Sequence, residues 1–239
     1  MPIKITEEAG VRYLQFGAHW VQGAMRLSRP WSLVLEYARD MMFPLLLRPT
    51  AWPRRVLTIG LGAAGLTKFL YRHRPRATID VVEIDAEVVL SAYAFFELPH
   101  DPARLSITID DGYRVMATSR RSYDLIQLDG FDAKVEAGNL DSVPFYRHCL
   151  ARLAPGGLLA VNLVSRRGRP KESIARIAEV FGGRVLVLPP NDANTVVLAS
   201  RDRPRYLSRT QLFRRADAIK AQTGLDLGAT LKRLCGPRR

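Results

Sequence analysis

The stretch Thr58–Leu66, TIGLGAAGL, carries three glycines in the spacing G-x-G-x-x-G directly after a short apolar run. Such a loop between a strand and a helix is typical of open α/β sheets that hold a nucleotide at the start of the helix. Gly60, Gly62 and Gly65 let the backbone approach a ligand closely, because they carry no Cβ. The spacing alone fits a dinucleotide and any other adenosine-bearing cofactor equally well.

Segments of strand and helix character alternate along the chain around this loop. We predict strands at residues 55–59, 78–84, 105–109, 124–128 and 158–164, and helices at residues 64–73, 86–98, 142–153 and 170–181. Strands that alternate with helices indicate a doubly wound, mostly parallel sheet with right-handed crossovers.

The end of the predicted sheet is different. Residues 183–188, GRVLVL, and residues 194–200, NTVVLAS, are separated by only five residues. So short a connection has no room for a crossover helix, so the two strands must pair antiparallel. This is the arrangement of class I S-adenosylmethionine-dependent methyltransferases, a Rossmann-like α/β fold with seven strands. A dinucleotide dehydrogenase would continue with parallel strands.

The first quarter of the chain predicts a separate small unit. Residues 11–27 read as short strands around Gly17 and Gly23, and residues 31–47 have helical spacing that Pro44 ends or kinks. We therefore expect an N-terminal β appendage over residues 1–52 and the cofactor-binding domain over residues 53–239.

Composition predicts an ordinary globular protein. The chain has 239 residues, of which 47% are hydrophobic and 25% charged. Cys149 and Cys235 stand far apart, so neither a disulfide framework nor a metal site is expected. The polar start and the charges within residues 31–47 argue against a signal peptide and a membrane span, which makes the cytoplasm the default location.

The formal net charge is +13, and residues 201–239 supply most of the excess, with eleven Lys or Arg and three Asp. Such a tail could attract nucleic acid, which we do not favour over a solvated helical face. We expect helical, basic surface that the cofactor pocket does not need. The alternative is that an apolar stripe docks the segment on the sheet; its members are Leu207, Leu212, Phe213, Ala216 and Ile219.

Acidic residues follow the second and third predicted strands. Ligands of open α/β sheets lie beyond the carboxyl ends of the strands. Glu83, 23 residues after Gly60, is placed to accept both hydroxyls of a ribose. In the run Asp110-Asp111-Gly112, a carboxylate can accept from an adenine amine. The competing interpretation is an N-cap for the following helix, and both roles can coexist.

Asp129 and Asp132 flank the end of the fourth predicted strand in LDGFDAK. An Asp- and Gly-rich turn explains them without function. As a functional pair they suit a cationic nucleophile, because a partly desolvated carboxylate with a raised pKa can accept the proton of an amine. Its neighbour would hold the rest of the amine. A sulfonium leaving group would need no metal.

Several stretches together resemble the spermidine synthase family, the polyamine aminopropyltransferases, over roughly residues 11–165. They are LQFGAHWVQGAMRL, VLTIGLGAAGL, VVEID, ITIDDG, YDLIQLDGFD and FYRHCLARLAPGGLLAVNL. The resemblance implies an aminopropyl transfer from decarboxylated S-adenosylmethionine to an amine such as putrescine, by a homodimer without a metal. It implies a ribose-binding Glu83, an adenine-side Asp111, a catalytic Asp129, and three substrate contacts at Gln22, Asp132 and Tyr146.

Three positions depart from the family pattern. Ala63 stands where the family typically has an Asp that binds the aminopropyl amine, and Ala133 replaces a proline after the second motif Asp. EYARDMM does not reproduce the family's Tyr-Gln-Glu contacts to the polyamine. Ala63 leaves ordinary S-adenosylmethionine as an alternative cofactor, so a methyltransferase is the second hypothesis. A non-catalytic protein that binds an adenosyl ligand or nucleic acid is the third, and a dinucleotide oxidoreductase is a distant fourth.

Overall fold

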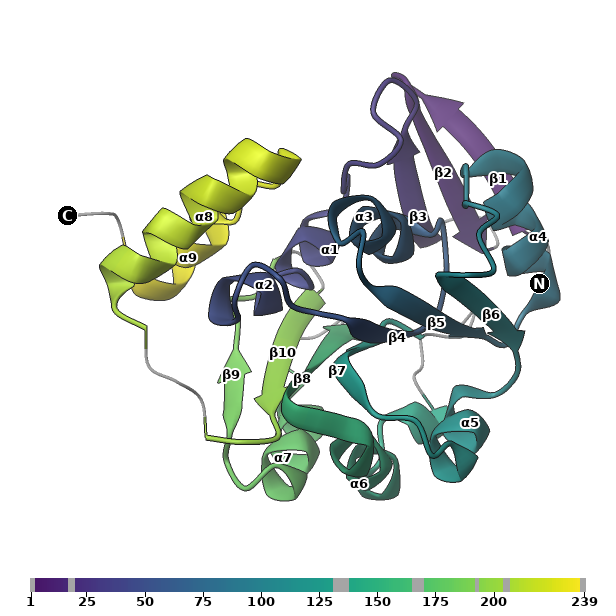
Figure 1. The fold of residues 1–239 in the computed structure, drawn as a ribbon. Coiled ribbons are helices and arrows are strands. Elements are labelled where there is room, and N and C mark those ends of the chain that lie inside the picture. Colours follow the sequence, from purple (N-terminus) through teal and green to yellow (C-terminus); the bar gives the residue numbers. More distant parts are fainter. Residues whose placement is uncertain are drawn as a thin grey trace.

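The central sheet of the computed structural model contains seven strands among the described residues, which are 3–16, 20–130, 138–164, 170–191, 194–203 and 207–236 (Figure 1). The strands are β4 (Arg55–Ile59), β5 (Thr78–Glu83), β6 (Leu105–Ile109), β7 (Tyr123–Leu128), β8 (Leu153–Val164), β9 (Val185–Val187) and β10 (Asn194–Ser200). Their spatial order is β6-β5-β4-β7-β8-β10-β9. β4 to β8 run parallel, whereas β10 is antiparallel to both β8 and β9. The predicted fold class and its terminal hairpin are confirmed.

Helices cover both faces of the sheet. They are α3 (Gly65–His73) and α4 (Ala86–Phe95) on one face, and α5 (Gly112–Thr118), α6 (Val143–Arg152) and α7 (Lys171–Val180) on the other. Successive strand residues point to opposite faces of the sheet. Leu125 of β7 packs in the hydrophobic core on the α3 and α4 side, and Ile126 packs in the core on the other side. Of the helices in the described parts of the chain, none is long and apolar enough to cross a membrane.

Two segments differ most from the prediction. The expected helix over residues 31–47 is two short helices, α1 (Glu36–Asp40) and α2 (Pro44–Leu47). Pro44 begins α2, because the first turn of a helix does not need the N–H that proline lacks. β8 begins at Leu153, immediately after α6, and runs through the glycines of APGG, where its register against β7 shifts.

The N-terminal appendage is a three-stranded antiparallel sheet of β1 (Ile3–Glu8), β2 (Val11–Phe16) and β3 (Trp20–Arg26). β1 extends the predicted hairpin by a strand. Gly23 lets β3 lie directly on the glycine loop, because a Cβ on Gly23 would overlap Ala63. Figure 1 shows the appendage standing beside α3 and α4. The appendage therefore forms a wall over the loop that follows β4.

The C-terminal segment contains α8 (Arg209–Thr223) and α9 (Gly228–Cys235), which lie beside α2 in Figure 1. Three members of the predicted apolar stripe are fully buried, namely Phe213, Ala216 and Ile219. Asp40 of α1, 2% exposed, accepts hydrogen bonds from Thr230, from Arg233 at 2.9 Å and from Asn191 at 2.7 Å. The stripe is buried, as the docking alternative predicts, and α8 packs against α2 and α9. The segment is part of the core.

Replacing Phe213 with Ala tests this packing. We expect the free energy of unfolding to fall by about 3–5 kcal/mol, because a large aromatic side chain leaves a cavity in a close-packed core. Urea denaturation measures the change. Arg214→Ala, at the adjacent exposed position, is the control and should shift stability by no more than about 0.5 kcal/mol. Equal effects of the two substitutions would contradict a docked α8.

Candidate active site

A cavity of about 370 Å³ opens at the carboxyl ends of the parallel strands, between the glycine loop and the appendage. Its wall includes eight of the predicted site residues: Gln22, Gly60, Gly62, Glu83, Asp110, Asp111, Gly112 and Asp129. This volume is within the usual range for small-molecule sites. Residues from β3, β4, β5, β6 and β7 thus converge on one site, as expected for an open α/β sheet.

The glycine loop needs two of its glycines. Gly60 has a φ of +90°, and a Cβ there would overlap the backbone carbonyl of Asp129. Gly62 has a φ of +50°, and its Cβ would lie 2.9 Å from the carbonyl oxygen of Gln22. Both positions therefore require glycine for conformation and for close packing. The loop is clamped between β3 and the end of β7.

Gly65 is different, because it begins α3 and does not line the main cavity. A Cβ at Gly65 would have Leu33 as its nearest neighbour at 3.7 Å, an ordinary contact. The third glycine of the motif thus lies outside the lining of the main cavity. A direct cofactor contact at Gly65 has no support from its position.

Glu83 ends β5 and ties the glycine loop to it. One carboxylate oxygen accepts from the backbone N–H of Leu61 at 2.8 Å, and the other accepts from that of Asp85 at 3.0 Å. Burial raises the pKa of Glu83, against the effect of these hydrogen bonds. The two contacts fix the plane of a carboxylate that lines the cavity.

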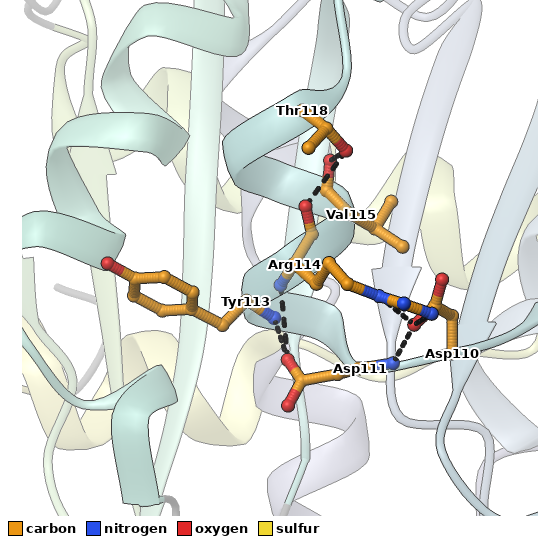
Figure 2. A network of polar contacts seen from close by, with 6 residues as sticks. All are labelled: Asp110, Asp111, Tyr113, Arg114, Val115 and Thr118. Atoms are coloured by element: carbon orange, nitrogen blue, oxygen red, sulfur yellow. Dashed lines mark hydrogen bonds and ion pairs between the residues drawn. The ribbon is translucent and has the colours of Figure 1, made fainter.

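Asp110 and Asp111 lie at the start of α5 (Figure 2). Asp111 Oδ1 accepts from the N–H groups of Tyr113 at 2.6 Å and Arg114 at 3.1 Å, so the predicted N-cap is confirmed. The Asp111 Oδ2 atom makes no hydrogen bond among the described residues, and Figure 2 shows it turned away from the helix. A hydrogen bond from Arg114 lowers the pKa of Asp110. Capping therefore leaves one oxygen of Asp111 available to a ligand.

Asp129 follows β7 at the centre of the cavity wall. Asn162 Nδ2 donates to its Oδ1 at 2.8 Å, and Tyr37 lies close enough to stabilise the ionised form. Burial nevertheless raises the pKa of Asp129 to about 6, and the charge of Glu83 adds to this. A carboxylate with such a pKa is ionised at neutral pH and is a stronger base than an ordinary Asp.

Tyr37 and Asn162 are site residues that the sequence did not reveal. Burial and the charge of Asp129 raise the pKa of Tyr37, which remains protonated at neutral pH. Asn162 is 3% exposed, and its Oδ1 has no partner among the described residues. A polar residue in the apolar strand LLAVNLV was the available signal, because a buried amide needs hydrogen-bond partners.

Two further positions from the sequence analysis lie away from the main cavity, and a third is not among the described residues. Tyr146 is fully buried and donates to Asp141 at 2.8 Å, and it does not line the cavity, so its position gives the predicted substrate contact no support. Asp132 falls outside the described residues. Ala63, 3% exposed, lines a small adjoining cavity of about 30 Å³ together with Tyr37 and Asp129.

The charged side chains that line the cavity are all acidic among the described residues: Glu83, Asp110, Asp111 and Asp129. A site with this lining favours a ligand that carries positive charge. Among the described residues, no group of three or more His, Cys, Asp or Glu side chains is arranged to hold a metal ion.

Comparisons with known proteins relate the chain to enzymes of polyamine synthesis. Residues 37–165 match the family model described as "Spermine/spermidine synthase domain". A polyamine aminopropyltransferase of Chromobacterium violaceum is 34% identical over 97% of this chain and 88% of its own length. The enzyme of that name from Neisseria meningitidis serogroup A is 34% identical over 94% of this chain and 85% of its own length.

Solved structures share the fold. A probable spermidine synthase from Corynebacterium glutamicum has a TM-score of 0.76 at 22% identity, covering 95% of this chain and 90% of its own. Human methyltransferase-like protein 13, in complex with SAH, has a TM-score of 0.68 at 24% identity, covering 86% and 95%. The fold is thus common to aminopropyltransferases and methyltransferases.

The raised pKa of Asp129 predicts that its ionised carboxylate destabilises the folded protein, and that this effect depends on pH. The folded state holds the proton of Asp129 up to a higher pH than the unfolded chain does. The free energy of unfolding therefore falls as pH rises from about 4 to about 6. Asp129→Asn removes this charge and should therefore be more stable than the wild type at pH 7.5. We expect a gain of only about 1–2 kcal/mol, because partial exposure of Asp129 through the cavity screens its charge.

Urea denaturation at several pH values measures this difference. The gain of Asp129→Asn should shrink toward pH 4, where the wild-type carboxyl is also neutral. A difference that does not vary with pH would contradict the raised pKa.

Proposed function

We propose that this chain, which belongs to the spermine/spermidine synthase family, transfers an aminopropyl group from decarboxylated S-adenosylmethionine to an amine. The family model spans more than half of the chain. The two aminopropyltransferases quoted above match the chain over nearly its whole length. The observation that carries the proposal is Asp129, a carboxylate with a pKa of about 6 in a cavity whose described charges are all negative.

The adenosyl part of the donor would lie along β4, β5 and β6. Glu83 would accept the two ribose hydroxyls, since its oxygens are already oriented by Leu61 and Asp85. The free oxygen of Asp111 would accept from the adenine amine. Gly60 and Gly62 would let the backbone approach the nucleoside.

The transfer is a displacement at carbon. The amine nitrogen forms a bond to the CH₂ of the aminopropyl arm that is attached to the sulfonium sulfur, the bond between this carbon and sulfur breaks, and its electron pair stays on sulfur as methylthioadenosine leaves. Deprotonating an amine with a lysine-like pKa of ~10.4 at neutral pH costs roughly 4–5 kcal/mol. Asp129 would accept that proton as attack proceeds, with Asn162 and Tyr37 fixing its orientation.

The charge of the cavity favours this donor over ordinary S-adenosylmethionine. The methyl donor carries a carboxylate, and the described lining supplies no Lys, Arg or His to pair with it. Decarboxylation removes that repulsion and leaves a cation. Ala63 supplies no carboxylate for the ammonium of the aminopropyl arm, so that charge would pair with the remaining acids of the cavity.

The acceptor would be a small amine such as putrescine. Gln22 lines the cavity on the appendage side and would contact it. Asp132 would bind its far end, although that residue lies outside the described part of the chain. We further propose that the enzyme is a homodimer and that it is cytoplasmic. The buried residues of α8 and α9 weaken the case for a tail that binds nucleic acid.

Asp129→Asn tests the proton acceptor. We expect kcat to fall by about 10²–10⁴-fold, because the substitution keeps size but removes basicity. Release of methylthioadenosine from decarboxylated S-adenosylmethionine and putrescine measures turnover. Asp80→Asn, at a carboxylate that pairs with Arg121 outside the cavity, is the matched control. Unchanged turnover in Asp129→Asn would rule out Asp129 as the base.

Glu83→Gln tests the nucleoside site separately from chemistry. Calorimetric titration with methylthioadenosine should show binding weakened by about tenfold or more, because two backbone donors would then face one carbonyl oxygen. Glu87→Gln, exposed on the first turn of α4, should bind as the wild type does. Equal affinities of the wild type and Glu83→Gln would remove Glu83 from the site.

A further inference from the structure

One wall of the cavity is a single turn of 3₁₀ helix, η1 (Gly138–Leu140). Leu140 packs where Gly112 and Gly130 lack side chains: Cβ atoms built there would lie 3.3 Å and 3.0 Å from its methyl groups. The loops after β6 and β7 therefore both meet Leu140. The position of this one side chain sets the width of the cavity between those loops.

Asp141 follows this turn and anchors it. Its backbone N–H donates to the carbonyl of Gly138 at 3.1 Å, which closes the turn. Its carboxylate accepts from three side chains on two helices: from Tyr146 of α6 at 2.8 Å, and from Ser173 at 2.7 Å and Arg176 at 2.6 Å on α7. Four interactions thus hold the residue next to Leu140.

The charges within this cluster are matched and partly shielded from water. The Asp141 side chain is 18% exposed and that of Arg176 is 34% exposed. Burial pushes the pKa of Asp141 upward, but the hydrogen bonds from Arg176, Ser173 and Tyr146 outweigh it and the pKa lies below its usual value. Asp141 is therefore ionised at neutral pH, and Arg176 is its single cationic partner among the described residues.

We propose that Asp141 and Arg176 are positioning residues, which hold Leu140 against the loops after β6 and β7 and thereby set the affinity of the cavity for the adenosyl donor. The inference rests on the proposed function, which places the nucleoside between those loops. It assigns a role to α7, a helix that contributes no residue to the cavity. Tyr146 acts through Asp141 and makes no contact with the substrate.

A purely structural role makes a different forecast. If the cluster only joined α6 to α7, breaking it would lower stability and would affect binding no more than any equally destabilising change. Arg215 of α8 offers that comparison, because it donates to the carbonyl of Leu46 at 2.8 Å, far from η1 in sequence and on another part of the core. Arg147, on α6, has a long ion pair of 3.9 Å with Glu179 as its one ion pair among the described residues, and it controls for loss of one positive charge.

The experiment measures binding and turnover in full-length Arg176→Gln, Arg176→Lys, Arg215→Gln and Arg147→Gln. Methylthioadenosine is the calorimetric probe, because it reports on the nucleoside site without turnover. For Arg176→Gln we expect its Kd and the KM for decarboxylated S-adenosylmethionine to rise by about threefold to thirtyfold, with kcat nearly unchanged. Arg176→Lys keeps the charge and should recover part of the affinity. The two controls should bind as the wild type does.

Two results would overturn the inference. One is an unchanged Kd in Arg176→Gln, and the other is an equal rise in Kd in Arg215→Gln at equal loss of melting temperature. Failure of the wild type to bind methylthioadenosine at all would instead refute the proposed function, and the inference with it. If Arg176→Gln does not fold, Ser173→Ala removes one hydrogen bond from Asp141, and an unchanged Kd there counts against the proposal.

Discussion

The contact on which the site depends is the packing of the Gly60 backbone against the carbonyl of Asp129. It brings the ends of β4 and β7 together, and two hydrogen bonds reinforce it: Asp129 N–H to the Ile59 carbonyl at 2.9 Å and Leu61 N–H to Glu83 at 2.8 Å. Any side chain at position 60 would separate the two strand ends. The Asp129 carboxylate and the glycine loop are therefore placed by the same contact.

This arrangement concentrates negative charge at a cost to the folded state. The charge of Glu83 raises the pKa of Asp129, and burial raises the pKa of both. Under the proposed function, a cationic donor and a cationic acceptor would reduce the repulsion among these carboxylates, and this reduction would favour substrate binding. The chain as a whole carries +13, which opposes the approach of an amine at long range. The acidic cavity acts at short range, where the amine loses its water.

The sequence predicted the features that repeat along the chain and missed those that depend on a single packing choice. Alternating segments and the short gap before NTVVLAS were sufficient for the mostly parallel sheet and its terminal hairpin. The acids at strand ends pointed to Glu83, Asp111 and Asp129, which line the cavity. Tyr37 was passed over because nothing in the spacing of residues 31–47 shows that its hydroxyl lies beside Asp129. The family resemblance assigned Tyr146 to the substrate, and its position in the sequence does not show that Asp141 accepts its hydroxyl. The apolar stripe of α8 was visible, but α2, against which α8 packs, is remote in the chain.

The central claim is that an acidic cavity without a described basic residue selects the cationic, decarboxylated donor. Calorimetric titration of the wild-type protein with decarboxylated and with ordinary S-adenosylmethionine, at one pH and ionic strength, tests it most directly. The decarboxylated compound should bind at least about tenfold more tightly, the equivalent of ~1.4 kcal/mol, because only ordinary S-adenosylmethionine brings a carboxylate among the acids. Equal or tighter binding of ordinary S-adenosylmethionine would contradict the claim.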